Sequence, residues 1–260
     1  MEREIYNSLQ LREIFHLEFL KWLNRESKVK NYILKGGSNL RFFFNSIRYS
    51  EDMDLDVCNI EVEMLKEVVI KILKSSSFGD GLKVFGIDRI VAPDMSKAKQ
   101  TNTTQRFKVH LLTFSGEDLF TKVEFSRRGI RGDAVVDTVS NSILRSYKSP
   151  PILASHYDGY SALIQKIDAL ATRSMVQARD VFDIYTLSSQ LMPGKINKSR
   201  LAKVKINKAY QRIFEIGFNQ YRDTVVSYLS SDDQALYGNS DLWDEVKLKV
   251  ASFIEELKAA

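Results

Sequence analysis

Aspartates stand at alternate positions of a short acidic stretch, which reads Asp-Met-Asp-Leu-Asp-Val over residues 52–57. Alternate residues of a strand share a face, so Asp52, Asp54 and Asp56 are expected on one side and the apolar residues on the other. Carboxylates about 5 Å apart repel each other by roughly 1 kcal/mol in water, and by several times more in a protein. A divalent cation removes that conflict, and oxygen ligands favour Mg²⁺ or Mn²⁺. The alternative is an edge strand whose aspartates are solvated.

The residues upstream predict the turn that would present a ligand to these aspartates. Residues 32–34 form a short apolar run, which predicts a buried strand. Gly36 and Gly37 then permit a tight turn with the backbone close to a ligand. Ser38 is expected to be the N-cap of a helix over about residues 39–47, and the amides at such a helix start can bind phosphate.

The glycine turn and the acidic stretch together resemble the sequence motif of a known protein family. The stretches that carry the resemblance are Gly36-Gly37-Ser38, Leu40-Arg41 and Arg48-Tyr49-Ser50-Glu51-Asp52-Met53-Asp54-Leu55. They are similar to the motif of the DNA polymerase β-type nucleotidyltransferases. More narrowly, they resemble the AbiEii/AbiGii branch, the toxin components of type IV toxin–antitoxin and phage-abortive systems. That branch commonly has Lys-Gly-Gly-Thr/Ser, a short helix and then Arg-x-Ser-x-Asp-x-Asp-Leu.

The resemblance implies a fold and a reaction. The fold is α/β, a polymerase β-like mixed sheet with flanking helices followed by a helical C-terminal domain. The reaction is the transfer of NMP from an NTP to an acceptor hydroxyl with Mg²⁺ or Mn²⁺. The residues implied at the nucleotide are Gly36, Gly37, Ser38 and Ser50, and Asp52 and Asp54 are implied as metal ligands and catalytic residues.

Glu124 is the expected third carboxylate. It lies in a strand predicted over residues 119–125, which forms a hairpin with residues 106–114. Since Glu124 alternates with Val123 and Phe125, it leaves the apolar face and can join the aspartates across the sheet. Polymerase β-type enzymes usually place a carboxylate on such a strand, so the resemblance implies Glu124 as a catalytic metal ligand. The alternative is simple exposure to solvent.

A second group of charges lies further along the chain. Lys166, Arg173 and Asp180 are each seven residues apart, and they share a face if one continuous helix carries them. Lys166 lies among apolar residues, so it either extends its ammonium to solvent at a domain seam or presents it to a triphosphate. Asp180 can cap the next helix or pair with the two cations, and Asp183 can do the same one turn on.

The resemblance continues in this region. The matching stretches are Lys166-Ile167-Asp168-Ala169-Leu170, Arg173 and Ala178-Arg179-Asp180-Val181-Phe182-Asp183-Ile184-Tyr185. Many relatives have a proline where Ala178 stands, which affects a helix start and leaves the chemistry unchanged. The resemblance implies that Lys166 and Asp180 line the active cleft, with Lys166 on the triphosphate.

Composition indicates an ordinary globular protein. Its 260 residues are 44% hydrophobic and 27% charged, with a net charge of +5 and a pI near 9.1. This basicity permits a polyanionic partner without requiring one. Cys58 is the only cysteine, which excludes an internal disulfide and a zinc cluster. Charges interrupt residues 1–24, and there is no run of about eighteen apolar residues, so no membrane association is expected and the cytoplasm is the expected compartment.

Two consecutive prolines predict a domain boundary in the chain. Ser149-Pro150-Pro151 predicts a boundary between a nucleotidyltransferase domain at residues 1–149 and a helical domain at residues 150–260 that completes the active cleft. In the first domain, helices are expected at residues 3–24 and 61–74, a strand at 82–91, and loops at 75–81 and 92–104. In the second, helices are expected at residues 155–174, 179–191, 198–206, 209–229 and 241–258.

The acceptor is left open by the residues themselves. The resemblance implies tRNA or another RNA for some relatives, and basic residues within 97–106 and 127–131 are compatible with it. It also implies a genetically paired antitoxin, without direct contact. One alternative is a nucleotidyltransferase for a small molecule such as an aminoglycoside, which needs an acidic acceptor pocket. Another is a non-catalytic nucleotide- or RNA-binding domain, which would be expected to have lost an aspartate or the Gly-Gly-Ser turn, and neither is lost here.

Overall fold

A computed structural model of the chain describes residues 6–26, 29, 31–96, 98–201 and 205–259. The chain divides into two compact units. The first consists of Met1–Phe43, Tyr49–Ile130 and Ala134–His156, and the second of Phe44–Arg48, Arg131–Asp133 and Tyr157–Ala260. The functional boundary expected at residues 149 and 150 stays a prediction.

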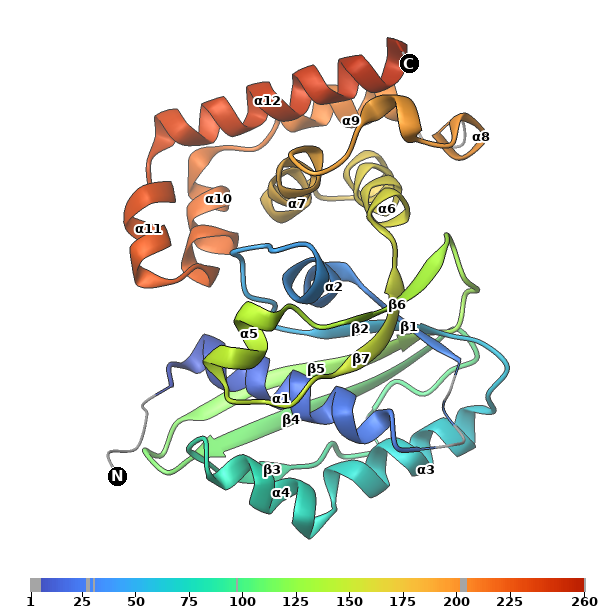
Figure 1. Cartoon of the computed structure of the whole chain (residues 1–260), viewed down its shortest axis with the longest axis vertical. Helices are drawn as coiled ribbons and strands as arrows, with labels where there is room; N and C mark the ends of the chain where they lie inside the picture. Colours follow the sequence, from blue (N-terminus) through green and yellow to red (C-terminus); the bar gives the residue numbers. More distant parts are fainter. Residues whose placement is uncertain (1–5, 27–28, 30, 97, 202–204, 260) are drawn as a thin grey trace. The chain divides into compact units, whose positions relative to one another are not determined.

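A mixed sheet forms the centre of the first unit (Figure 1). Within the described residues, its seven strands follow the order β3 (Ile87–Val91), β4 (Thr104–Thr113), β5 (Asp118–Ser126), β2 (Met53–Val57), β1 (Tyr32–Lys35), β7 (Leu153–Tyr157) and β6 (Ala134–Thr138). Strand β2 runs parallel to β5 and antiparallel to β1, and β7 runs parallel to β1. The predicted mixed α/β fold is confirmed.

Helices lie on both faces of this sheet. Figure 1 shows α1 (Ser8–Leu23), α3 (Val62–Leu73) and α4 (Ser76–Lys83) along one face, and α2 (Gly36–Phe43) on the other. The apolar residues of β2 face the core, where Met53 and Leu55 are fully buried with Phe125 of β5. The predicted alternation in this strand is therefore confirmed for its apolar side. Helix α1 begins behind Asn7, whose side chain and that of Gln10 form a capping box. Residues 3–5 of the predicted first helix lie outside the described residues.

Several local predictions in this unit were wrong. Helix α2 begins at Gly36, so Ser38 lies inside its first turn and does not cap it. Residues 76–83 form α4 rather than a loop, because the Ser75 hydroxyl accepts a hydrogen bond from the Phe78 amide and caps a helix despite the neighbouring glycines. The next strand consequently begins at Ile87. Strands β6 and β7 and helix α5 (Asn141–Ser146) were not predicted.

The second unit is built from helices, as predicted. They are α6 (Gly159–Thr172), α7 (Ala178–Ser188), η1 (Pro193–Lys195), α8 (Lys198–Leu201), α9 (Ile206–Ile213), α10 (Phe218–Thr224), η2 (Val226–Tyr228), α11 (Ser231–Tyr237) and α12 (Ser240–Ala259). Trp243 of α12 stacks on Tyr221 of α10 with ring centroids 4.2 Å apart, and both are buried in this unit's core.

Helix lengths in this unit differ from the prediction. Residues 155–157 belong to β7, and α6 starts only at Gly159, where Asp158 accepts a hydrogen bond from the Ser161 amide. The single helix predicted over residues 209–229 is interrupted between Ile213 and Phe218, and its second part, α10, ends at Thr224. Residues 202–204 of another predicted helix lie outside the described residues. Among the helices described, none has the length and hydropathy required to cross a membrane.

Candidate active site

Asp54 is the central residue of an acidic group in the first unit. The parallel register of β2 and β5 pairs Asp54 with Glu124, and the antiparallel register of β2 and β1 pairs it with Lys35. Burial raises the pKa of the Asp54 carboxyl, and the negative charges of Asp52 and Glu124 raise it further. The positive charges of Lys35 and Lys122 act in the opposite direction. The charged form of Asp54 is therefore held in an environment that disfavours it.

Asp52 precedes β2 and has one carboxylate oxygen free of protein hydrogen bonds. Its Oδ2 accepts a hydrogen bond from Lys122 Nζ at 2.5 Å, whereas its Oδ1 is buried and has no hydrogen-bond partner. A buried carboxylate oxygen without a partner is rare, because its desolvation is uncompensated. An electropositive ligand at Oδ1 would satisfy it.

Two serines fix the backbone at this position. Ser38 Oγ and Ser50 Oγ each donate a hydrogen bond to the carbonyl oxygen of Asp52, both at 2.8 Å. Each hydroxyl hydrogen is thus already used within the protein. Contact of Ser38 and Ser50 with a nucleotide stays a prediction, while their hydrogen bonds hold the Asp52 backbone in place.

The glycine turn is in direct contact with the aspartates. Gly36 has φ +69°, which L side chains rarely adopt, and a Cβ at this position would lie 3.0 Å from Asp54 Oδ2. Gly37 follows in the first turn of α2, where backbone amides have no intrahelical partner. A small residue is required here because the chain passes tightly against the Asp54 carboxylate.

Basic residues balance the acids on this face of the sheet. Arg106 Nε contacts Glu124 Oε2 at 2.6 Å, and Lys35 Nζ contacts Asp56 Oδ1 at 2.5 Å. The roles of Lys35 and Lys122 were missed from the sequence. A signal was available for Lys122, because it stands two positions before Glu124 and shares its face of β5.

Within the described residues, no three carboxylate, imidazole or thiol groups are arranged as a metal site. The residues nevertheless fit a cation: Asp52 Oδ1 lacks a partner, and the charged form of Asp54 lacks full compensation. Both are hard oxygen ligands of the kind that Mg²⁺ and Mn²⁺ bind. Glu124 would add a third once Arg106 released it.

The second unit holds a buried network of ion pairs. Asp183 is fully buried and is contacted by Arg48 Nη2 at 2.9 Å and by Lys166 Nζ at 2.6 Å. Asp180, also fully buried, is contacted by Lys166 Nζ at 3.4 Å and by Arg173 Nε at 2.8 Å. Burial acts to raise the pKa of Asp183, but the charges of Arg48 and Lys166 outweigh it and lower the pKa.

This network joins two separate helices, as the helices expected at residues 155–174 and 179–191 implied, so the three residues do not lie on one continuous helix. Helix α6 ends at Thr172 and α7 begins at Ala178. The turn between them folds the chain back, and Asp180 reaches Lys166 and Arg173 from the neighbouring helix. Gln177, rather than Asp180, occupies the N-cap position of α7. The contact between Arg48 and Asp183 was not predicted, because the two residues are 135 positions apart.

The basic segments considered for RNA are partly engaged within the protein. Arg127 donates hydrogen bonds to Gln105 Oε1 at 3.0 Å and to the carbonyl oxygen of Ile60. Arg106 is paired with Glu124, as described above. Lys97 lies outside the described residues. Arg127 and Arg106 are therefore held by protein contacts in this structure.

A comparison with models of protein families identifies the family of this chain. The family model described as nucleotidyl transferase AbiEii toxin, type IV toxin–antitoxin system, matches residues 18–244. The chain belongs to this AbiEii nucleotidyltransferase family. No curated protein matches the sequence.

Solved structures agree with the AbiEii fold. The protein JHP933 from Helicobacter pylori is 16% identical with a TM-score of 0.60, and 98% of this chain and 94% of that chain are covered. A putative nucleotidyltransferase from H. pylori is 15% identical with a TM-score of 0.60 over 98% and 97% of the two chains. The nucleotidyltransferase toxin MenT4 from Mycobacterium tuberculosis is 16% identical with a TM-score of 0.60 over 95% and 83%. At these identities the likeness concerns the fold.

Proposed function

We propose that this AbiEii-family protein transfers a nucleoside monophosphate from an NTP to an acceptor hydroxyl in a reaction that depends on Mg²⁺ or Mn²⁺. The observation that carries the proposal is the buried, unpartnered Oδ1 of Asp52 beside Asp54, whose own charged form is disfavoured. Two adjacent carboxylates in this state favour a cation, and a cation beside a helix start favours a phosphate group.

In this reaction the acceptor oxygen attacks the α-phosphorus in line. A new phosphorus–oxygen bond forms, the bond between the α-phosphorus and the bridging oxygen to the β-phosphate breaks, pyrophosphate leaves, and the proton of the acceptor hydroxyl passes to solvent water. Two divalent cations, when bound, activate the attacking oxygen and stabilise the leaving one. Asp52 and Asp54 are assigned to hold the cations together with nucleotide oxygens. Glu124 is assigned to the cation on the side of the acceptor.

Backbone and hydroxyl groups at the start of α2 are assigned to the nucleotide. Gly36 and Gly37 allow phosphate oxygens to approach the first-turn amides of α2, and the helix dipole adds a favourable field. Ser38 and Ser50 hold the Asp52 carbonyl and border this position. We assign Lys166 the role of neutralising the negative charge of the β- and γ-phosphates. We assign Asp180 the role of orienting Lys166, because its carboxylate contacts the Lys166 ammonium.

RNA, and tRNA in particular, is the proposed acceptor. The net charge of +5 is compatible with a polyanionic partner, and the net positive charge of the protein rises further when bound cations neutralise the acidic group. Such a modification would stop translation, which agrees with the toxin role of the AbiEii family. We accordingly assign the protein to the cytoplasm, beside a genetically paired antitoxin whose direct contact is not required.

Competition between acceptors tests this assignment. Radiolabelled product should form with bulk tRNA as acceptor and should persist when small amino-sugars are added in excess. If amino-sugars take the label and tRNA does not, the protein modifies small molecules instead. If neither takes the label from any NTP in the presence of Mg²⁺ or Mn²⁺, the proposal of RNA modification is rejected.

A further inference from the structure

We propose that strand β6 is the dimerisation edge of this protein and pairs antiparallel with β6 of a second copy. Strand β6 is last in the order of the sheet, so one of its sides has no neighbouring strand among the described residues. All of its residues, Ala134 to Thr138, are exposed. Open strand edges carry rows of unpaired amide and carbonyl groups that readily accept another strand.

The two edges of the sheet are protected to different degrees. The opposite edge, β3, carries Asp88 and Arg89 and has an irregular register between Ile87 and Arg89, and both features discourage strand addition. Strand β6 has the sequence Ala-Val-Val-Asp-Thr, with no proline or lysine and with two β-branched apolar residues at its centre. Of these, Val136 is 65% exposed. Its one charged residue, Asp137, contacts His156 of β7, so β6 carries fewer features that discourage strand addition than β3 does.

Backbone hydrogen bonds define which groups of β6 point outward. The Val139 amide donates to the Ile152 carbonyl at 2.9 Å, and the Asp158 amide donates to the Asp133 carbonyl at 3.1 Å. Both bonds fit a single antiparallel register between β6 and β7. Because such bonds alternate along a strand, the amide and carbonyl groups of Ala134, Val136 and Thr138 point toward the open edge.

These groups are self-complementary about Val136. A twofold axis at Val136 places it opposite Val136 of the second copy and places Ala134 opposite Thr138, and each facing pair can exchange two backbone hydrogen bonds. Asp137 then faces Val135 rather than another Asp137, so no like charges are directly opposed. A second copy of this chain thus satisfies the edge without introducing a repulsive pair.

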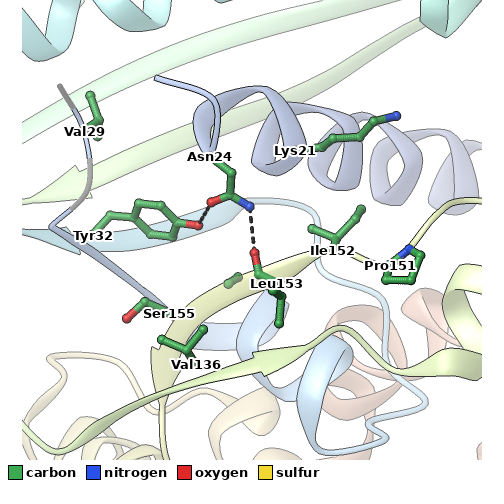
Figure 2. Close-up of a pocket in the computed structure, with 10 residues that line it drawn as sticks. Lys21, Asn24, Val29, Tyr32, Val136, Pro151, Ile152, Leu153 and Ser155 are labelled. Carbon is green, nitrogen blue, oxygen red and sulfur yellow. Dashed lines mark hydrogen bonds between the residues drawn. The ribbon is translucent and has the colours of Figure 1, made fainter. Parts of the chain in front are cut away.

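An apolar surface beside the edge extends the contact. A pocket of about 540 Å³ in the first unit is lined by residues that include Val136, Leu153, Tyr32 and Asn24. Figure 2 shows these side chains. Leu153 is 58% exposed. Pairing through β6 joins the Val136 side chains of both copies on this face and continues toward each Leu153. Five paired residues span about 17 Å, which is short, so a reversible, concentration-dependent dimer is expected.

Sedimentation velocity across a range of protein concentrations tests the proposal. The wild-type protein should pass from monomer to dimer as its concentration rises. Val136→Lys and Val136→Asp should each weaken the dimer by about tenfold or more, because like charges meet at the axis. An equimolar mixture of the two variants should restore the dimer through opposite charges. Val84→Lys, at a valine that is 74% exposed and lies at the end of α4, is the matched control and should behave as wild type.

Three outcomes would overturn the proposal. The first is a wild-type protein that stays monomeric at the highest concentration, which would leave the β6 edge to a different partner. The second is a Val136→Lys variant that dimerises as well as the Val84→Lys control. The third is a mixture of the two charge variants that remains monomeric, since this would exclude the register centred on Val136.

Discussion

Asp54 and Glu124 are direct neighbours on the parallel strands β2 and β5. The two residues are distant in the sequence, and it is the pairing of their strands that brings Glu124 into the acidic group. Asp52 joins them from the residue just before β2, with one buried oxygen unpartnered. The proposed chemistry therefore depends on sheet register as much as on the Asp-x-Asp pattern.

Removing either charge of the aspartate pair should abolish nucleotidyl transfer. Asp52→Asn and Asp54→Asn each keep the side-chain shape and lose a negative ligand for the cation, so the rate should fall by about two to three orders of magnitude or more. Transfer of label from an NTP to RNA measures it, and circular dichroism checks the fold. Asp118→Asn, at an exposed acidic residue of β5, should retain wild-type activity. Retained turnover in either site variant would remove that aspartate from the mechanism.

Asp54→Asn should also stabilise the folded protein at neutral pH. The pKa of Asp54 is raised by burial and by its acidic neighbours, so the ionised form destabilises the fold at pH values above that pKa. The asparagine variant removes this destabilisation. Its advantage should shrink as the pH falls and the wild-type carboxyl becomes protonated. Thermal unfolding with a chelator present, at several pH values, measures the difference, and an Asp54→Asn protein that melts below wild type at neutral pH would contradict the electrostatic account.

Gly36→Ala should destabilise the protein and impair the site together. The positive φ of Gly36 costs an alanine about 1–2 kcal/mol, and the added Cβ presses on Asp54 Oδ2. Urea unfolding gives the first effect and the transfer assay the second. Gly81→Ala is the control, because nothing lies within 4 Å of its added Cβ and it stands in α4, where alanine is favoured. Equal effects of the two substitutions would argue against a special role for the turn at Gly36.

Breaking the ion pair between Arg48 and Asp183 should destabilise the second unit. Asp183→Asn leaves the buried Arg48 guanidinium without its full counter-charge, and the expected loss is about 3–5 kcal/mol in urea unfolding. Glu255→Gln, which removes an exposed pair on α12, should cost less than about 1 kcal/mol.

The same pair predicts a pH dependence. Since the pKa of Asp183 is lowered in the folded state, its stabilising effect is present above the pKa of an ordinary aspartate and is lost as the pH falls through the lowered value. The difference in stability between wild type and Asp183→Asn should therefore narrow in acid. A difference that is independent of pH would assign the effect to packing instead.

Sequence patterns were informative where one local signal acted alone. The apolar run before Gly36 and the alternation after Asp52 gave β1 and β2, because burial of one face fixes both. The pattern failed at residues 155–157, which were predicted to begin a helix and instead end β7, because this strand passes almost directly into α6. It also failed at α4, where three serines and two glycines predict a loop unless the cap at Ser75 is recognised.

The acidic residues of the candidate site could be predicted from the sequence, whereas the contacts of its basic residues could not. Asp52, Asp54 and Glu124 follow from alternation and from the family motif, whereas Lys122 and Arg106 acquire their partners only through the pairing of β5 with β2 and β4. The contact of Arg48 with Asp183 depends on tertiary folding across most of the chain. Spacing along a sequence does not contain that information.

Transfer of the labelled α-phosphate of each NTP to total RNA, in Mg²⁺, is the most direct test of the proposed activity. Wild-type protein should label a discrete RNA species with at least one of the nucleotides, and addition of a chelator or the substitution Asp54→Asn should remove the label. Labelling that survives both the chelator and the substitution would contradict the assignment of the acidic group as the catalytic centre.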